Sequence, residues 1–299
     1  QIFDFLMPGL LGTRESFAKR FESPVEHAEG DSAARLQALV SPFVLRRVKE
    51  EVVADLPEKI EDTVMAQLTG EQRKLYLANQ DRIAQQVQHR EAGEFKKDKL
   101  KVLAELTKLR QICCDPHLHY ADYKAGSAKL DTCMELVHGA LDGGHRILLF
   151  SQFTGMLDII GKRLAKEDIA FLKLTGASSK ESRAKMVAQF QAGEVPVFLI
   201  SLKAGGVGLN LTAADVVIHY DPWWNVAAQD QATDRAHRIG QQHTVTVYKL
   251  IAKDTIEERI MQMQESKRDL VNSVLGGDGI SSALFTREDV LALLGGDGR

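Results

Sequence analysis

From about residue 128 onward, short apolar runs alternate with longer amphipathic segments. Apolar runs without alternation are typical of strands buried on both faces of a parallel sheet, and the amphipathic segments between them are typical of crossover helices. The apolar runs are RILLFS (146–151), AFLKL (170–174), VFLIS (197–201), VVIHY (216–220) and TVYKLI (246–251). The amphipathic segments cover 154–166, 180–192 and 226–238. We therefore predict one doubly wound α/β domain over residues 128–270, with helices on both faces of its sheet.

The part before this domain is predicted to be mainly helical. Apolar residues recur at helical spacing in 31–49, where Pro42 interrupts them, and residues 60–69 alternate as in a half-buried strand. A long polar helical pattern covers 71–114; its lysine-rich stretch at 94–101 is either a solvated helix face or a patch that contacts phosphates. A Gly/Ser-rich tail ends in a short predicted helix, 287–294. The predicted segments are 1–57, 58–125, 126–272 and 273–299.

Bulk composition excludes several classes of protein. The net charge of the 299 residues is −3, so any nucleic-acid surface must be local. Three cysteines without a CxxC pair indicate reduced thiols in an intracellular protein, in the cytoplasm, nucleoid or nucleus, and no structural zinc. No apolar run is long enough to predict a membrane span. The chain begins without Met and is interpreted as a piece of a longer protein.

Polar stretches follow four of the predicted strands, where ligands of such sheets bind. They are SQFTG (151–155), LTGASSKESR (174–183), SLKAGGVGLNL (201–211) and DPWWN (221–225). We expect them, together with QATDRAHRIGQ (231–241), to lie at one edge of the sheet. Glycines 205, 206 and 208 let backbone N–H groups approach an anion, although a turn that caps the strand explains them equally well.

The stretch 231–241 places Gln231, Arg235 and Arg238 at i, i+4 and i+7, which predicts one face of a helix. Guanidinium groups stay protonated and match phosphate oxygens with paired donors, so the pair suits a transferring phosphoryl group. The alternative is a surface ion pair between Asp234 and Arg238 within the helix. His237 is interpreted as a helix-surface residue.

The sequence contains no GxxxxGK[ST] loop and no acidic pair at a strand end. The chain therefore lacks the usual means of holding a nucleoside triphosphate with its metal by itself, and we predict no metal site in it.

Several stretches, in order and spacing, resemble the second RecA-like lobe of the SWI/SNF family of ATP-dependent remodelling translocases, in helicase superfamily two. They are RILLFSQFTGMLDII (motif IV), LTGASSKESRAKMVAQF, FLISLKAGGVGLNLTAADVVIHYDPWWN (motif V and its extension), QATDRAHRIGQ (motif VI) and VYKLIAKDTIEERI. Upstream, SPFVLRRVKEEVVADLPEK resembles the link between the lobes, and FDFLMPGLLGTRESFAKRF the segment after motif III. The resemblance covers 1–270. Val226 stands where the family usually has Pro, and CCDPHL replaces an asparagine–histidine–proline form.

The resemblance implies a RecA-like fold and roles for particular residues. Arg235 and Arg238 match arginine fingers that reach the γ-phosphate of ATP, and Gln231 matches a glutamine that organises the cleft. Positions near the nucleotide are Gly206, Gly208 and Asn210. Positions facing the DNA backbone are Ser151, Gln152, Thr175, Gly176, Ser201 and Lys203. Trp223 and Trp224 match an aromatic extension that couples the two sites, with core packing as the alternative for one of them.

The function implied is the C-terminal half of a motor that moves along double-stranded DNA. ATP and Mg²⁺ would bind only together with a first lobe that this chain lacks, so the chain alone is expected to be inactive. The partners implied are duplex DNA, the missing lobe and DNA-bound protein as the remodelling target, with no membrane. Two alternatives remain open: a catalytically inert DNA- or protein-binding module, and a strand-separating helicase. The HRIGQ, PWWN and LRR stretches favour the translocase.

Overall fold

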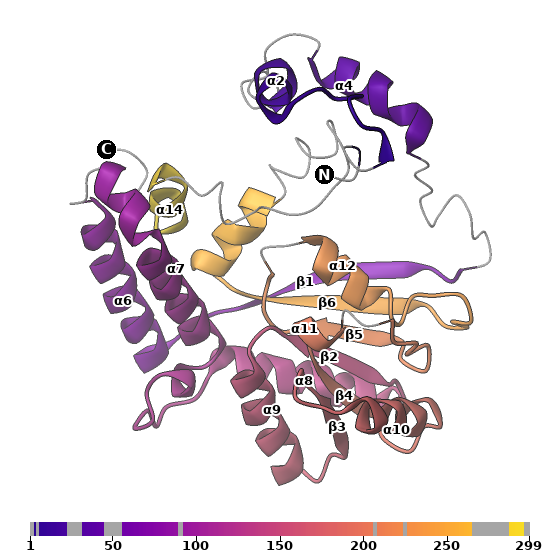
Figure 1. Cartoon of the computed structure of the whole chain (residues 1–299). Coiled ribbons are helices and arrows are strands. Elements are labelled where there is room, and N and C mark those ends of the chain that lie inside the picture. Colours follow the sequence, from indigo (N-terminus) through magenta and orange to yellow (C-terminus); the bar gives the residue numbers. More distant parts are fainter. Residues whose placement is uncertain are drawn as a thin grey trace. The chain divides into compact units, whose positions relative to one another are not determined.

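The computed structural model describes residues 3, 6–22, 32–44, 56–88, 92–205, 208–223, 226–264 and 287–295. The chain divides into two compact units, shown in Figure 1. The smaller unit comprises residues 1–54 and 265–278, and the larger one comprises residues 55–264 and 279–299. Among the described residues, no helix is both long and apolar enough to cross a membrane.

The described part of the smaller unit, residues 3, 6–22 and 32–44, is mainly helical, as predicted. It contains α2 (Arg14–Phe17), a π-helical turn (Ala18–Glu22), α4 (Ser32–Val40) and a short 3₁₀ turn (Ser41–Phe43). Pro42 lies in the first turn of that 3₁₀ segment, where a missing N–H is tolerated, so it ends α4. Phe21, Leu36 and Val40 form a small buried cluster.

The larger unit is built on a six-stranded, all-parallel sheet with the strand order β1-β6-β5-β2-β4-β3. Its strands are β1 (Lys59–Ala66), β2 (Ile147–Ser151), β3 (Phe171–Leu174), β4 (Val197–Ser201), β5 (Val216–His219) and β6 (Val245–Ala252). The five strands predicted after residue 128 are confirmed. So is the α/β class with a parallel sheet.

Helices cover both faces of this sheet, which confirms the doubly wound arrangement. They are α8 (Ala128–Asp142), α9 (Thr154–Lys166), α10 (Lys180–Gln191), α11 (Leu202–Gly205) and α12 (Val226–Thr233). Side chains of β2 alternate between the faces: Ile147 and Leu149 pack with α8 and α9, whereas Leu148 and Phe150 pack with α10, α11 and α12. Both sides of the strand are therefore buried.

The strand predicted at 60–69 is confirmed as β1, which pairs with β6 along its whole length, from Lys59 opposite Val245 to Ala66 opposite Ala252. The sequence did not predict this pairing. β1 is exposed over residues 59–63 and buried only at Ala66, rather than half-buried throughout, because it is the edge strand.

The polar pattern at 71–114 forms two helices, α6 (Gly70–Gln88) and α7 (Ala92–Cys114). They pack with helical residues 256–264 and with α14 (Arg287–Leu293) around a hydrophobic core of their own, separate from the cores on the two faces of the sheet. In Figure 1, α14 lies beside α6. The predicted final helix is thus confirmed. Gln80 donates from Nε2 to the Leu294 carbonyl at 2.7 Å, which holds the end of α14.

Candidate nucleotide and DNA site

All six strands run in the same direction, so the loops after β2, β3, β4 and β5 begin at one edge, here called the carboxyl edge. A buried carboxylate, Asp221, lies at the centre of this edge, two residues after β5. It accepts hydrogen bonds from the Ser151 hydroxyl and from the Gln152 backbone N–H, at 3.3 Å from N to Oδ1. Arg110 on α7 approaches the same carboxylate, with Nη2 at 4.0 Å from Oδ2. Asp221 therefore joins the loop after β2 to the loop after β5.

The six residues predicted to face DNA are not equally accessible. Gln152, Thr175 and Gly176 lie at the surface of the carboxyl edge or partly buried in it. Ser151 and Ser201 differ from the prediction, because they end neighbouring central strands and are 0% and 3% exposed. The Ser151 hydroxyl is bonded to Asp221 instead of facing solvent. The side chain of Lys203, and the residues Gly206 and Trp224, lie outside the described part of the chain.

The loop after β3 is held in shape by Arg183, which the sequence analysis did not single out. Its Nε donates to the Ser178 carbonyl at 3.0 Å, and its Nη2 donates to the Gly176 carbonyl at 3.4 Å. Thr175 donates its backbone N–H to the Ser178 hydroxyl. The loop is therefore fixed before any ligand binds, which lowers the entropic cost of binding.

The predicted helix at 226–238 is shorter than expected. α12 ends at Thr233, and residues 234–240 form turns, so Gln231, Arg235 and Arg238 do not share a helix face. The hydrogen bonds tighten to i→i−3 at this point: the N–H of Arg235 donates to the Ala232 carbonyl, and that of Ala236 to the Thr233 carbonyl. The buried His219 ring bonds the Thr233 hydroxyl at 2.8 Å and holds the helix end against β5.

Residues 234–241, here called the arginine loop, are held by three hydrogen bonds to other segments. The Arg235 carbonyl accepts from the N–H of Leu211 at 3.0 Å, and Gln241 donates from Nε2 to the Ala214 carbonyl at 2.7 Å. The His237 ring lies 2.8 Å from the Pro57 carbonyl and is only 9% exposed, so His237 is not the helix-surface residue that was predicted.

These contacts also correct the predicted location of the arginines. Ala214 precedes β5 and Pro57 precedes β1, so the arginine loop lies toward the amino-terminal ends of the strands. The reason is topological. A helix that follows a parallel strand runs back across the sheet to the start of the next strand.

The electrostatics of the arginine loop favour an anionic ligand. Arg235 is 8% exposed, and Arg238 is exposed. Burial lowers the pKa of Arg235, and the charge of Arg238 lowers it further, while Asp234 opposes the shift. The Arg235 guanidinium remains protonated at neutral pH because the reference pKa of arginine lies far above neutrality. Two neighbouring cations, one of them largely desolvated, are stabilised when a polyanion binds beside them.

The described part of the glycine-rich segment leaves room for a ligand. Gly208 has φ of +32°, and a Cβ added there would meet nothing within 4 Å. Both Gly208 and Asn210 are exposed. Trp223 is half-buried against the core beneath α12, in keeping with the packing alternative, and its carbonyl accepts from Gln264 Nε2. Among the described residues no cluster of three His, Cys, Asp or Glu side chains could hold a metal ion.

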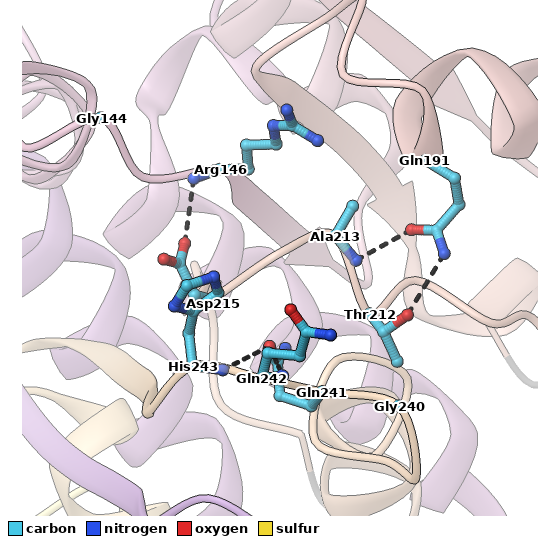
Figure 2. Close-up of a pocket in the computed structure, with 10 residues that line it drawn as sticks. All are labelled: Gly144, Arg146, Gln191, Thr212, Ala213, Asp215, Gly240, Gln241, Gln242 and His243. Atoms are coloured by element: carbon cyan, nitrogen blue, oxygen red, sulfur yellow. Dashed lines mark hydrogen bonds between the residues drawn. The ribbon is translucent and has the colours of Figure 1, made fainter.

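A separate polar pocket of about 350 Å³ lies at the amino-terminal edge, shown in Figure 2. Gln191 accepts from the Ala213 N–H and donates to the Thr212 hydroxyl, and Asp215 accepts from the Arg146 N–H. These polar groups hold the segment 212–215 at the start of β5. The pocket is therefore part of the support beneath the arginine loop, whose Gly240 and Gln241 also line it.

Comparison with known proteins agrees with this architecture. Residues 1–118 match the SNF2-related domain model and residues 128–240 match the helicase conserved C-terminal domain model. An uncharacterized ATP-dependent helicase of Mycoplasma pneumoniae is 39% identical over 97% of this chain, which spans 28% of that relative's length.

Two solved structures from Sulfolobus solfataricus are similar to the chain. The SWI2/SNF2 ATPase core in complex with dsDNA has a TM-score of 0.67 and 36% identity, covering 98% of this chain and 62% of the other. The SWI2/SNF2 ATPase C-terminal domain has a TM-score of 0.64 and 31% identity, covering 79% of this chain and 98% of the other. The parallel RecA-like sheet, the order of the motifs and these matches together establish that the chain belongs to the SWI2/SNF2 family.

Proposed function

We propose that this chain is the C-terminal half of an ATP-dependent motor that translocates on double-stranded DNA. The observation that carries the proposal is the arginine loop. Its Arg235 and Arg238 lie close enough for their charges to interact, and the loop is held by contacts to two other segments, at Pro57 and at 211–214. Catalysis of phosphoryl transfer depends mainly on positive charge that is already in place when the γ-phosphate departs. A fixed arginine pair supplies that charge.

In this proposal, ATP binds between the larger unit and a first RecA-like lobe outside this chain. That lobe would supply the Walker loop and the Mg²⁺ ligands, so the present chain alone would be inactive. Arg235 and Arg238 would contact the γ-phosphate, Gln231 would organise the cleft, and Gly206, Gly208 and Asn210 would lie near the nucleotide. Hydrolysis of bound ATP would release its γ-phosphoryl group, and the negative charge near the two arginines would then change.

The DNA contacts would come from the opposite, carboxyl edge. Gln152, Thr175, Gly176 and the Lys203 side chain are the proposed contacts with the DNA backbone. The amino terminus of α9 begins at this edge without a side-chain cap, so its N–H groups and helix dipole favour a phosphate there. Contacts to phosphates carry little sequence information and weaken as salt rises. The dsDNA bound in the similar Sulfolobus structure supports a duplex as the track.

One segment of chain that connects the two proposed sites is 201–211, besides 221–234, which includes α12. The first begins at Ser201, at the carboxyl end of β4, and reaches Leu211, whose N–H bonds the Arg235 carbonyl. A shift of the arginine loop during hydrolysis would therefore pull on a segment anchored at the DNA-binding edge. We propose this segment, with the aromatic pair Trp223 and Trp224, as the coupling between hydrolysis and the grip on DNA.

The remaining parts of the proposal concern the whole protein. Its target would be protein bound to DNA, and strand separation is not required for movement along a duplex. It would act inside the cell, in the cytoplasm, nucleoid or nucleus. The segment boundaries at 57, 125 and 272 stay predictions, which variants shortened at those positions would test.

The proposal is tested by measuring ATP hydrolysis by the full-length protein with and without duplex DNA, for the wild type and for Arg235→Ala and Arg238→Ala. We expect duplex-stimulated hydrolysis that falls by about 10³-fold or more in each variant, as for other arginine fingers. Arg163→Ala is the matched control, because Arg163 is an arginine at the surface of α9 that pairs with Glu167.

Two results would contradict this function. Full hydrolysis in both arginine variants would mean that the pair is structural. A full-length protein that binds duplex DNA without hydrolysing ATP would be the binding module considered above. Release of a labelled strand from a partial duplex, in the same preparation, would identify a strand-separating helicase instead.

A further inference from the structure

His237 lies between the two arginines of the arginine loop in sequence, yet it is only 9% exposed, whereas Arg238, which follows it, is exposed. Its ring bonds the carbonyl of Pro57, in the segment that leads into β1, at 2.8 Å. We propose that His237 is a positioning residue, which fixes Arg238 for phosphoryl transfer by tying the arginine loop to the segment through which the chain enters the larger unit. This inference rests on the proposed function.

The contact between His237 and Pro57 fixes the arginine loop to the sheet. A carbonyl oxygen can only accept a hydrogen bond, so Nε2 of His237 carries a proton and donates it. The next carbonyl along the chain, of Glu58, accepts the N–H of Val245 at 3.0 Å, where the pairing of β1 with β6 begins. Pro57 is therefore held in place by the first contact of the two strands, and its ring restricts its own backbone further.

Arg238 lies between two side-chain anchors of the arginine loop. His237 is the anchor on one side, and on the other Gln241 donates from Nε2 to the Ala214 carbonyl at 2.7 Å. The Arg238 carbonyl accepts the N–H of Gln241 at 2.9 Å, which closes a turn between the anchors. Without His237 this turn would be held from one side only. Because phosphoryl transfer depends on positive charge placed in advance, a displaced Arg238 would slow the reaction.

A second interaction joins the same two segments. Lys59, at the start of β1, is attracted by Asp230 of α12 and by Asp234 of the arginine loop. Burial lowers the pKa of Lys59, but the hydrogen bond and charge of Glu61, followed by the charges of the two aspartates, outweigh burial and the pKa is raised. The start of β1 and the arginine loop are thus joined by an electrostatic attraction as well as by the His237 hydrogen bond.

These contacts lie close to the point where the chain passes from one compact unit to the other. The first stretch of the smaller unit ends at residue 54, so Pro57 is among the first residues of the larger unit. A displacement carried along the chain from the smaller unit would reach the arginine loop through Pro57 and His237. Hydrolysis would in this way respond to the position of the smaller unit.

The test compares ATP hydrolysis by the full-length protein with His237→Gln and with His237→Leu, at saturating duplex DNA. The amide nitrogen of Gln lies as many bonds from Cβ as Nε2 of His and keeps a donor for the Pro57 carbonyl, whereas Leu fills the space without a donor. We expect kcat to fall about tenfold or more in His237→Leu, with KM for ATP and duplex affinity unchanged, and to recover most of that loss in His237→Gln. His138→Leu is the matched control, because His138 is an exposed histidine on α8 that pairs with Glu167.

A double variant separates positioning from a general loss of stability. In the Arg238→Ala background, followed with radiolabelled ATP, His237→Leu should lower the rate by less than about a further twofold, because its effect passes through Arg238. A merely structural histidine would lower the rate by the same factor in both backgrounds. That result would overturn the inference, and so would an unchanged kcat in His237→Leu or a His237→Gln variant as slow as His237→Leu.

If His237→Leu does not fold, Pro57→Gly tests the same contact from the other side, since it keeps the carbonyl and frees the backbone that presents it. It should lower kcat in the otherwise wild-type protein and leave the rate of Arg238→Ala unchanged, and an equal fall in both would contradict the inference. A wild type without duplex-stimulated hydrolysis refutes the proposed function itself, whereas an active wild type with an equally active His237→Leu variant refutes only the role of His237.

Discussion

Replacing Lys129 by Met should destabilise the larger unit more than most single substitutions do. Lys129 on α8 and Glu257 are both 0% exposed and form a double contact, with Nζ at 2.8 Å from Oε1 and 2.6 Å from Oε2. Burial alone would lower the pKa of Lys129, but the attraction of Glu257 outweighs it and the pKa is raised. The lysine is therefore charged in the folded protein. Its ammonium also lies 5.2 Å from the centre of the Tyr220 ring.

The size of the effect follows from what Lys129→Met leaves behind. Glu257 would stay buried without its cation, and breaking one side of a buried ion pair costs about 3–5 kcal/mol. Adding Glu257→Gln removes the orphaned charge and keeps an amide oxygen to accept the Ala252 N–H, now bonded at 2.9 Å. The double variant should therefore recover most of the loss and lie within about 1–3 kcal/mol of the wild type, the range for an imperfectly paired buried polar group.

Urea unfolding at pH 7, followed by circular dichroism, measures both variants against the wild type. The decisive quantity is the difference in the free energy of unfolding between the double variant and Lys129→Met. A loss below about 1 kcal/mol in Lys129→Met, or a double variant no more stable than the single one, would refute the reasoning, because either result means that the two charges are solvated in the folded protein.

Three further effects follow from the packing and from the proposed function. Burial, followed by the charge of Lys249, lowers the pKa of His219 to about 3, so between pH 6.5 and 3 the unfolded chain binds a proton that the folded one does not. The free energy of unfolding should therefore fall by about 1.4 kcal/mol for each pH unit of acidification through that window. Urea unfolding at several pH values should show this slope in the wild type and lose it in His219→Gln. Gly161→Ala should destabilise the protein by about 1–3 kcal/mol, because the added Cβ would lie 2.9 Å from the Phe171 ring. Gly139→Ala on α8, with open space around it, should stabilise the protein by about 0.5–1 kcal/mol. Thermal unfolding distinguishes the two variants by the sign of the change in stability. Duplex affinity of the full-length protein should fall linearly on a log–log plot against salt, and a flat line would contradict binding through phosphates.

The central strands were predictable because burial on both faces leaves a direct trace in the sequence. Each of VFLIS and VVIHY is a predominantly apolar run without the alternation of a half-buried strand, and a parallel sheet covered by helices is the structure that needs such runs. β1 carries no such trace of its partner. An edge strand with exposed residues looks similar whether it pairs with β6, pairs elsewhere or stands apart.

The site was predictable in its residue types and less so in its geometry. The spacing of Arg235 and Arg238 fits a helix, but tertiary hydrogen bonds at Thr233 and Leu211 end that helix and decide the outcome. Asp221 and Arg110 carry no local pattern that marks them as partners. Their contact depends on the docking of α7 against the end of β5, a long-range arrangement that periodicity does not encode.

The pairing of β1 with β6 has a consequence for how the protein is made. The first strand of the sheet emerges from the ribosome before α6, α7 and all four strands between, and its partner in the sheet is the last strand to be synthesised. At typical rates of about 5–20 residues per second, β1 waits on the order of ten seconds or longer. During that interval it is a strand edge without its neighbour, and its charged residues, among them Lys59 and Glu61, are the features that discourage pairing with another chain. Completion of the sheet is thus a late event of synthesis, and a chain that stops before residue 245 leaves both β1 and β5 open.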